Sequence, residues 1–277
     1  MYYKYDLKNG IIYDCAKFLI PILITIIACI SFNSIITSAE INEMLDRNAD
    51  FADLLLYIFK GEKTFNPLED EEFHFPFMWL IIQLSVAFIV GKYPFSEIYD
   101  NYGSVILIKG KSRKKWIISK FLWIVTVCVL FYLLIIITAI IFSLIFGFSF
   151  NLKVFPSQSF VYLTSINFLD SRILIKLFLL PLATSIALSF FQTAISLLFQ
   201  PVYGFVCILI ICGTSIFTDS IYAFGRYSLL IRYEYFNISN ISIKTAILTL
   251  SIISIFSFLF CLVYFEKCDI LHNRRNE

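Results

Sequence analysis

Long apolar segments alternate with short polar ones along this chain. Six segments consist mainly of apolar residues, and they cover about residues 15–36, 75–90, 116–148, 173–198, 202–216 and 243–265. A helix needs roughly 20 apolar residues to cross about 30 Å of hydrocarbon. The pattern therefore predicts an all-α polytopic membrane protein with six transmembrane helices in one domain, residues 1–277. The second and fifth segments are short, and the third is long enough to tilt.

The composition supports a membrane protein. Hydrophobic residues make up 59% of the chain, aromatic residues 18%, and the mean hydropathy is +0.83. A soluble domain of this length could not bury that much apolar surface in one core. The first segment resembles a signal peptide in outline, but it is too long and lacks a cleavage site with small residues, so we expect a retained anchor. The abundance of Ile, Phe, Asn and Lys is typical of a bacterial chain, which indicates the cytoplasmic membrane.

The basic residues indicate an orientation. They are most frequent at the N-terminus, between the second and third segments and at the C-terminus. The loop at residues 37–74 is instead rich in carboxylates, including the run Glu69 to Glu72. The positive-inside rule then places both termini and the loop at residues 91–115 in the cytoplasm, with residues 37–74 and 217–242 outside. The acidic run could hold a divalent cation, although charge runs of this kind are usually solvated.

Several kinds of chemistry find no support in the sequence. The two histidines, His74 and His272, lie outside the apolar segments, and the chain has neither HExxH nor GxSxG, which argues against an intramembrane enzyme. The seven cysteines fall mostly within apolar segments and indicate neither a disulfide nor a metal site. Juxtamembrane basic residues set topology and attract lipid headgroups, so nucleic acid is not an expected partner. We predict no catalytic residue and no cofactor bound by this chain.

The stretch from Pro94 to Lys120 has a pattern of its own. Apolar residues recur at helical spacing, and polar residues take the opposite face; the apolar set is Phe95, Ile98, Tyr99, Tyr102, Val105 and Ile106. This pattern predicts a helix that lies flat at the membrane surface, broken at Gly110, with Trp116 anchoring the next span. The alternative is an ordinary cytoplasmic loop with a positive tail. Gly110 to Ser112 end like a P-loop, but Val105 replaces its first glycine, so no nucleotide site is expected.

The topology and this stretch together resemble the permease subunits of type-2 ABC transporters. The residues that match the motif of that family are Glu97, Gly103, Ser112, Arg113 and Lys120. The aromatic-rich connection at residues 217–242 is similar to the external re-entrant helices of that family. The resemblance covers nearly the whole chain in topology, but its motif is short, and the chain has no large external domain.

The resemblance implies that ATP and Mg²⁺ are bound by cytosolic ABC ATPase subunits, and that a second copy or a sister permease completes the transporter. The amphipathic stretch would be a coupling helix that docks on the ATPase. Its contact residues would be Phe95, Glu97, Ile98, Tyr99, Asp100, Tyr102, Gly103, Lys109, Lys111, Ser112 and Arg113. The substrate would be a hydrophobic or amphipathic peptide, a bacteriocin or antibiotic, or a lipid-like molecule, and export is the expected direction.

Two polar residues inside the apolar segments are candidates for a substrate pathway. Gln83 and Gln192 fall within predicted spans, and polar groups in hydrocarbon generally face the bundle interior or a pathway. Hydrogen bonding between helices is the alternative for each. A secondary transporter or channel is the rival function, and it would normally show buried ionisable residues or matching broken helices. Charged residues are scarce at the centres of the apolar segments, which favours the ATP-driven reading.

Overall fold

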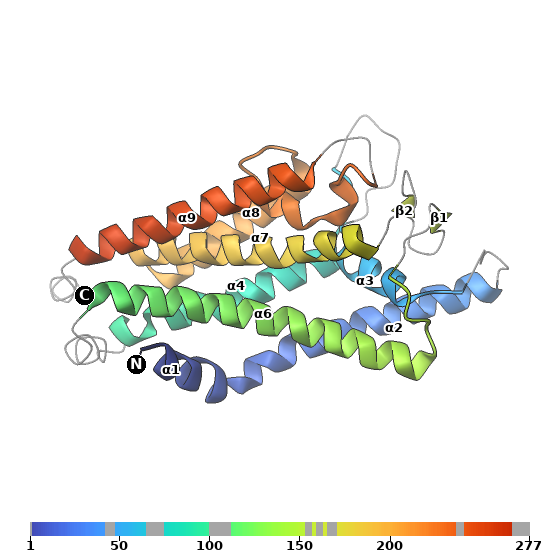
Figure 1. Cartoon of the computed structure of the whole chain (residues 1–277), viewed down its shortest axis with the longest axis horizontal. Helices are drawn as coiled ribbons and strands as arrows, with labels where there is room; N and C mark the ends of the chain where they lie inside the picture. The colour runs from blue at the N-terminus through green and yellow to red at the C-terminus, as the bar shows by residue number, and fades with distance from the viewer. Residues whose placement is uncertain are drawn as a thin grey trace.

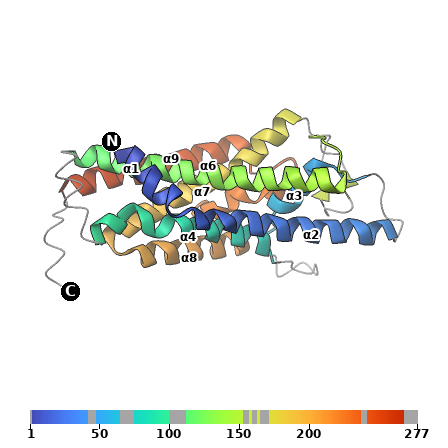
Figure 2. The ribbon, with the colours of Figure 1, turned by 90° about the horizontal axis from the view of Figure 1, so that it is seen from below.

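Helices arranged along one long axis form nearly all of the computed structural model. The structure describes residues 2–41, 48–64, 75–99, 112–152, 157–158, 163–164, 171–236 and 241–267. The long helices are α2 (Leu19–Ile41), α4 (Phe77–Tyr99), α6 (Arg113–Phe146), α7 (Ser171–Leu198), α8 (Pro201–Phe217) and α9 (Ile243–Lys267). They run side by side along the long axis (Figure 1; Figure 2). The all-α prediction is confirmed in the described residues, apart from a two-stranded hairpin of β1 (Ser157–Gln158) and β2 (Leu163–Thr164).

Four helical stretches are long and apolar enough to cross a membrane. They are Cys15–Ile41, Arg113–Phe146, Arg172–Leu198 and Ile243–Lys267, and Phe77–Gly91 and Pro201–Phe217 are shorter apolar helices. At 1.5 Å per residue, the 34 residues of α6 extend about 51 Å, more than the hydrocarbon thickness. The 17 residues of α8 extend about 26 Å. These helices are those of a multi-pass membrane protein, and four of them are long enough to cross the hydrocarbon completely.

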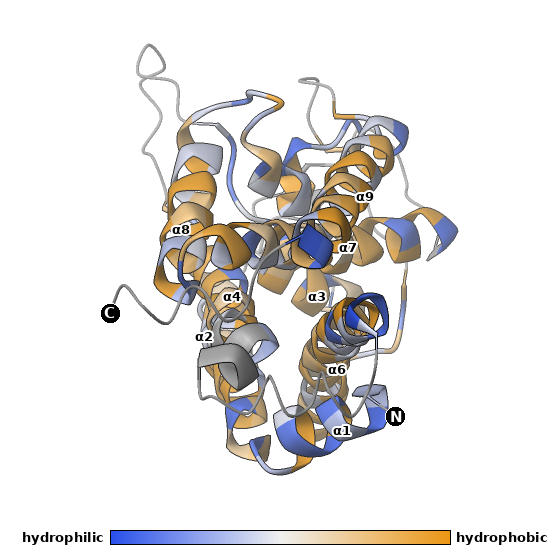
Figure 3. Cartoon of the chain, turned by 90° about the vertical axis from the view of Figure 1, so that its left-hand side faces the viewer, coloured by the Kyte–Doolittle hydropathy of each residue, from blue (hydrophilic) through white to orange (hydrophobic). Residues whose placement is uncertain are grey.

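Three segments depart from the simple alternation of spans and loops. A short helix, α1 (Tyr2–Leu7), and helical turns at Lys8–Ile12 and Cys15–Phe18 precede α2. The helix α3 (Phe51–Phe59) lies in the stretch expected to be a loop, and nearly all of its residues are buried. Turns at Phe224–Ser228 and Leu230–Arg232 pack against the bundle between α8 and α9. Figure 3 shows polar residues on α1 and mostly apolar ones on the long helices.

The expected surface helix needs one correction. We predicted that the second span ends near residue 90 and that a separate surface helix includes Phe95, but α4 continues through Pro94 to Tyr99. A proline ring clashes mainly with the carbonyl one turn earlier, and in apolar surroundings neighbouring groups can compensate for the lost hydrogen bond. Residues 95–99 therefore extend α4 instead of starting a new element. The rest of the expected surface helix lies outside the described residues.

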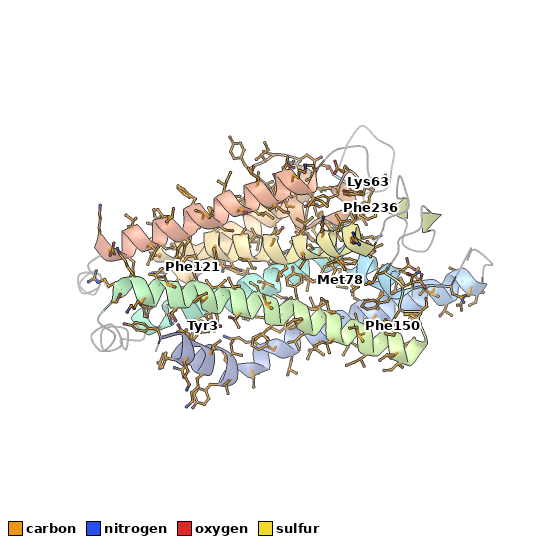
Figure 4. All side chains as sticks on the ribbon, in the orientation of Figure 1. Tyr3, Lys63, Met78, Phe121, Phe150 and Phe236 are labelled. Carbon is orange, nitrogen blue, oxygen red and sulfur yellow. The ribbon has the colours of Figure 1, made fainter. Side chains whose placement is uncertain are left out.

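Two apolar clusters form the core. The larger one joins α2, α3, α4, α6, α7, α8 and the first half of α9 with the turns at 224–232. The smaller one joins α6, α7 and α9 near the end of the bundle where α1 lies, through residues such as Trp116, Phe121 and Phe265. The ring of Phe121 lies 4.5 Å from that of Phe190 and 5.0 Å from that of Phe258, measured between centroids (Figure 4). We call this end of the bundle the α1 end; it also holds the C-terminal ends of α4 and α9 and the N-terminal end of α6 (Figure 1).

Candidate functional site

The candidate site is the α1 end, where α4 and α6 flank the segment at residues 100–111. Most of the expected coupling residues cannot be placed there. The side chains of Phe95, Glu97, Ile98 and Tyr99, and all of Asp100, Tyr102, Gly103, Lys109 and Lys111, lie outside the described residues. Ser112 and Arg113 are described, as is Lys120 of the same motif. These three residues and their neighbours define the geometry of the site.

Ser112 and the two residues after it join the start of α6 to the end of α9. Ser112 is the N-cap of α6, and its Oγ accepts a hydrogen bond from the backbone N–H of Lys115 at 3.4 Å. Arg113 Nη1 donates to the carbonyls of Phe265 at 3.3 Å and Glu266 at 3.1 Å. These carbonyls belong to the last turn of α9, which a cation stabilises through the helix dipole. Lys114 Nζ lies 3.1 Å from Glu266 Oε1.

Lys120 is buried about two helical turns further along α6. Its side chain is 1% exposed, and its Nζ lies 2.6 Å from Oδ1 of Asp6, whose side chain is 2% exposed. Ser119 Oγ donates to the other oxygen of the same carboxylate, and Tyr93 Oη donates to Oδ1 at 3.2 Å. The carboxylate of Asp6 thus receives hydrogen bonds from both α4 and α6. We call Asp6, Tyr93, Ser119 and Lys120 the Asp6 network.

Aromatic rings surround the ammonium group of this network. Lys120 Nζ lies 4.8 Å from the centroid of the Tyr93 ring and 5.0 Å from that of Trp116. Trp116 stacks on Phe265 of α9 at 4.8 Å between centroids. A buried ammonium is costly unless it is paired, and here a carboxylate and two ring faces compensate. The Asp6 network therefore connects α1, α4 and α6 at one end of the bundle, and the stacking of Trp116 on Phe265 adds α9.

The N-terminal segment packs tightly on the helices that flank residues 100–111. A Cβ atom built on Gly10 would lie 2.5 Å from Nε1 of Trp123 and 2.7 Å from the ring of Tyr93, so only glycine fits this contact. Tyr3 Oη lies within hydrogen-bond distance of Thr126 Oγ1, at 2.8 Å (Figure 4). The segment is thus held along α6 at several points.

A family model matches residues 18–271 of the chain. The chain belongs to the DUF2705 family. This family is described as proteins of unknown function. No curated protein and no solved structure matches the chain. In this DUF2705 protein the matched range includes Lys120 and leaves out its partner Asp6.

Gln83, a candidate for the substrate pathway, lies in a polar network in the middle of the bundle. Its Oε1 accepts a hydrogen bond from Ser185 Oγ of α7 at 2.9 Å, and its Nε2 lies 3.4 Å from Tyr132 Oη of α6. Tyr132 Oη in turn donates to the carbonyl of Pro181 at 3.0 Å. The side chain of Gln83 is buried and connects three helices. Its geometry is that of a hydrogen bond between helices, the alternative that the sequence left open.

Gln192, the second candidate, lies closer to the α1 end. Its Nε2 donates to the carbonyl of Ala87 on α4 at 3.0 Å, while its Oε1 is buried without a hydrogen-bond partner in the described structure. Within the described residues, no group of three or more His, Cys, Asp or Glu side chains is arranged to hold a metal ion. The site is therefore one of charge pairing and helix contacts.

Sequence reasoning did not identify Asp6. It sits in a short polar stretch before the first apolar segment, where a carboxylate is normally solvated. One signal was available. Lys120 is a lysine four residues inside an apolar segment, with no carboxylate nearby in the sequence, and Asp6 is one of two carboxylates, with Asp14, that precede the first apolar segment. A buried lysine requires a counter-charge, and the choice of Asp6 depends on the tertiary fold.

Proposed function

We propose that this chain is the permease subunit of an ATP-driven ABC exporter in the bacterial cytoplasmic membrane. In this proposal α2, α4, α6, α7, α8 and α9 are six spans, the α1 end faces the cytoplasm, and ATP and Mg²⁺ are bound by partner ATPase subunits. A second copy or a sister permease completes the transporter. The substrate is a hydrophobic or amphipathic molecule.

The observation that best supports this proposal is that side-chain contacts link the helices on both sides of residues 100–111. The Asp6 network connects the end of α4 to the start of α6, and Arg113 and Trp116 connect α6 to the end of α9. A force applied to the segment between α4 and α6 would be passed to α1 and α9 through buried charged and aromatic contacts. That is what a coupling element requires, because movement of a docked partner has to shift whole helices.

The lengths of the two shorter helices are compatible with six spans. The 23 residues of α4 extend about 34 Å, enough to cross the hydrocarbon, because the helix continues beyond its most apolar part. The α8 helix extends about 26 Å and is followed by the packed turns at residues 224–232, which can supply the remaining depth.

The test is a charge reversal in the proposed coupling segment. In a double Glu97→Lys, Asp100→Lys variant, wrong-signed charges enter the ATPase interface, and association should weaken by roughly 30-fold or more, the equivalent of about 2 kcal/mol or more. The measurement is the amount of ABC ATPase that co-purifies with the affinity-tagged chain at equal membrane expression, quantified by mass spectrometry, together with transport.

The matched control is Glu40→Lys, a charge reversal near the end of α2, at the opposite end of the bundle. It should leave recovery of the ATPase unchanged. If the double variant recovers as much ATPase as the unmodified chain and transport is also unchanged, the acidic residues do not couple anything. If no ABC ATPase is recovered even with the unmodified chain from its native host, the permease proposal itself is wrong.

A further inference from the structure

One face of α7 is polar along half of the helix. Ser185, Ser189, Gln192 and Ser196 follow one another at spacings of four, three and four residues, which places them in one stripe. All four are 1% exposed. In a helix within hydrocarbon, a continuous polar stripe needs partners on the neighbouring helices. We call these four residues the polar face of α7.

The neighbours of the polar face change along its length. Ser185 bonds to Gln83 of α4, and Ser189 Oγ lies 3.8 Å from the thiol of Cys128 on α6. Both of these groups therefore have partners. Toward the α1 end the situation differs, because Gln192 Oε1 and Ser196 Oγ are buried and have no hydrogen-bond partner in the described structure. Unpaired polar atoms in a buried, apolar environment are unfavourable, so this arrangement favours any state that supplies them with partners.

Backbone from two other helices lies against the same two residues, Gln192 and Ser196. A Cβ atom on Gly204 of α8 would lie 2.2 Å from Ser196 Oγ and 2.8 Å from the backbone oxygen of Gln192. A Cβ atom on Gly91 of α4 would lie 2.9 Å from Gln192 Nε2. The two glycines thus let α4 and α8 come into direct contact with the polar face, where a side chain of any size would keep them apart.

We propose that the polar face of α7 is the wall of the substrate route, and that Gly91 and Gly204 close it against Gln192 and Ser196 at the α1 end. Opening is the separation of α4 and α8 from α7, which hydrates the two unpaired atoms or lets substrate bond to them. This inference rests on the proposed function, which supplies the force that opens the route. Because α4 leads directly into residues 100–111, a pull on that segment would move Gly91 away from Gln192.

The chemistry of the polar face indicates the class of substrate. The buried polar residues of α7 are all uncharged hydroxyls and amides, each with a donor and an acceptor: Thr184, Ser185, Ser189, Gln192, Thr193 and Ser196. A main-chain amide also offers one donor and one acceptor, so a peptide passing along this face can exchange hydrogen bonds from group to group. An acyl chain has none to exchange, and a charged headgroup would find no counter-charge on this helix face. The route therefore fits a peptide with few charges and apolar side chains.

Cys128 provides a reporter that leaves the polar face intact. It is a free, fully buried thiol beside Ser189. In a variant with the other six cysteines replaced by alanine, a small charged methanethiosulfonate reagent should modify Cys128 slowly in inside-out vesicles. Gly204→Ala places a methyl group against backbone and must displace α8, so labelling of Cys128 should rise by roughly tenfold or more. Gly91→Ala displaces only the amide end of Gln192, so we expect a smaller rise.

The controls come from the same helices. A Cβ atom on Gly213 of α8 meets no atom within 4 Å, so Gly213→Ala should leave the labelling rate unchanged. A variant that keeps only Cys29, a buried thiol of α2, should not respond to Gly204→Ala. If Gly204→Ala does not fold, Gly91→Ala still tests the gate. Unchanged labelling of Cys128 in every folded glycine variant, or an equal rise with Gly213→Ala, overturns the gate.

A protection assay tests the class of substrate. An N-acetylated, C-amidated peptide of leucine and phenylalanine, added to vesicles with the Gly204→Ala variant, should slow the labelling of Cys128, whereas lysophosphatidylcholine at the same concentration should not. Equal protection by the lysolipid, or no protection by the peptide, overturns the peptide assignment. The assay needs no ATPase. Failure to recover any ABC ATPase with the unmodified chain would therefore reject the permease proposal without altering this result, and failure of the protection assay would leave the recovery of the ATPase unaffected.

Discussion

Asp6 and Lys120 form an ion pair that is almost completely shielded from solvent, and its two members lie 114 residues apart in the chain. Removing one partner of a buried ion pair leaves an uncompensated charge, which typically costs about 3 to 5 kcal/mol. We therefore expect Asp6→Asn to lower the thermal stability of the purified protein in detergent, measured from the temperature at which the chain aggregates on size-exclusion chromatography. Lys120→Met should have a similar effect.

Two further variants separate charge pairing from loss of packing. The double variant Asp6→Asn, Lys120→Met removes both charges and should recover most of the lost stability, because no unpaired charge remains. Asp14→Asn breaks the ion pair between Asp14 and Lys17. The side chain of Asp14 is 44% exposed, so the free energy of unfolding should change by about 1 kcal/mol or less. A double variant as unstable as the sum of the two single ones would contradict the assignment of the network as a charge pair.

At the residue scale, the sequence predicts polar positions better than it predicts their partners. Gln83 and Gln192 were identified because a polar side chain inside an apolar segment is conspicuous. Their partners, Ser185 and the carbonyl of Ala87, depend on which helices become neighbours, and the spacing along the chain does not contain that information. Asp6 was missed for the opposite reason, since its local surroundings are polar and only the fold buries it.

At the scale of elements, two segments that the sequence assigned to loops pack against the bundle. The capping contact of α3 is visible in the sequence as Asp50 and Asp53 before an apolar run, and the backbone N–H of Asp50 donates to Asp53 Oδ2 at 2.8 Å. The acidic surroundings of this run led to a loop assignment. The long apolar helices were predicted well, because 20 apolar residues have few alternatives, whereas α3 has only nine residues and needs its tertiary contacts to form.

Arg232 holds the second of these segments against the end of α8. Its Nη1 donates to the carbonyl of Ser215 at 2.7 Å, its Nη2 to that of Ile216 at 2.9 Å and its Nε to that of Glu62 at 3.1 Å. Burial lowers the pKa of Arg232 to about 10, and the nearby carboxylate of Asp219 opposes this shift. The guanidinium thus satisfies orphan carbonyls at the end of α8 and joins it to the chain after α3.

We expect Arg232→Lys to destabilise the protein by about 2 kcal/mol or more, although the charge is kept. An ammonium group cannot reach three carbonyls arranged around a planar fork, and each buried carbonyl left without a partner costs about 1 to 3 kcal/mol. Thermal unfolding in detergent measures the effect. Arg172→Lys, at an exposed position at the start of α7, is the matched control and should be neutral. Equal stability of both variants would show that the hydrogen bonds from the Arg232 guanidinium to the three carbonyls do not stabilise the protein.

At the scale of the whole molecule, charge is separated between the two ends of the bundle. Of the 22 Lys and Arg residues, 13 belong to the N-terminal segment, to residues 92–120 or to the C-terminal segment from Lys267 onward, and the remaining 9 belong to the other side. Carboxylates show the opposite bias, with 7 of 20 on the side of the termini. Figure 1 shows that the helix ends attached to the basic segments all lie at the α1 end. Sequence and fold therefore agree on which segments lie at the same end of the bundle. That this end faces the cytoplasm is a prediction from the positive-inside rule.

Single cysteines at exposed positions of the two ends test this orientation. Tyr222 is 89% exposed and lies between α8 and α9, at the end opposite α1, and Lys115 is exposed at the start of α6. In a background without the seven native cysteines, Tyr222→Cys should react with a membrane-impermeant maleimide in intact cells, because the positive-inside rule places it outside. Lys115→Cys should react only after the membrane is permeabilised. The reverse pattern would place the α1 end outside, where no cytosolic ATPase could reach residues 100–111, and it would rule out the proposed coupling. Labelling of both positions in intact cells would show that the two ends are not separated by a membrane, and the assignment of α2, α4, α6, α7, α8 and α9 as spans would then fail.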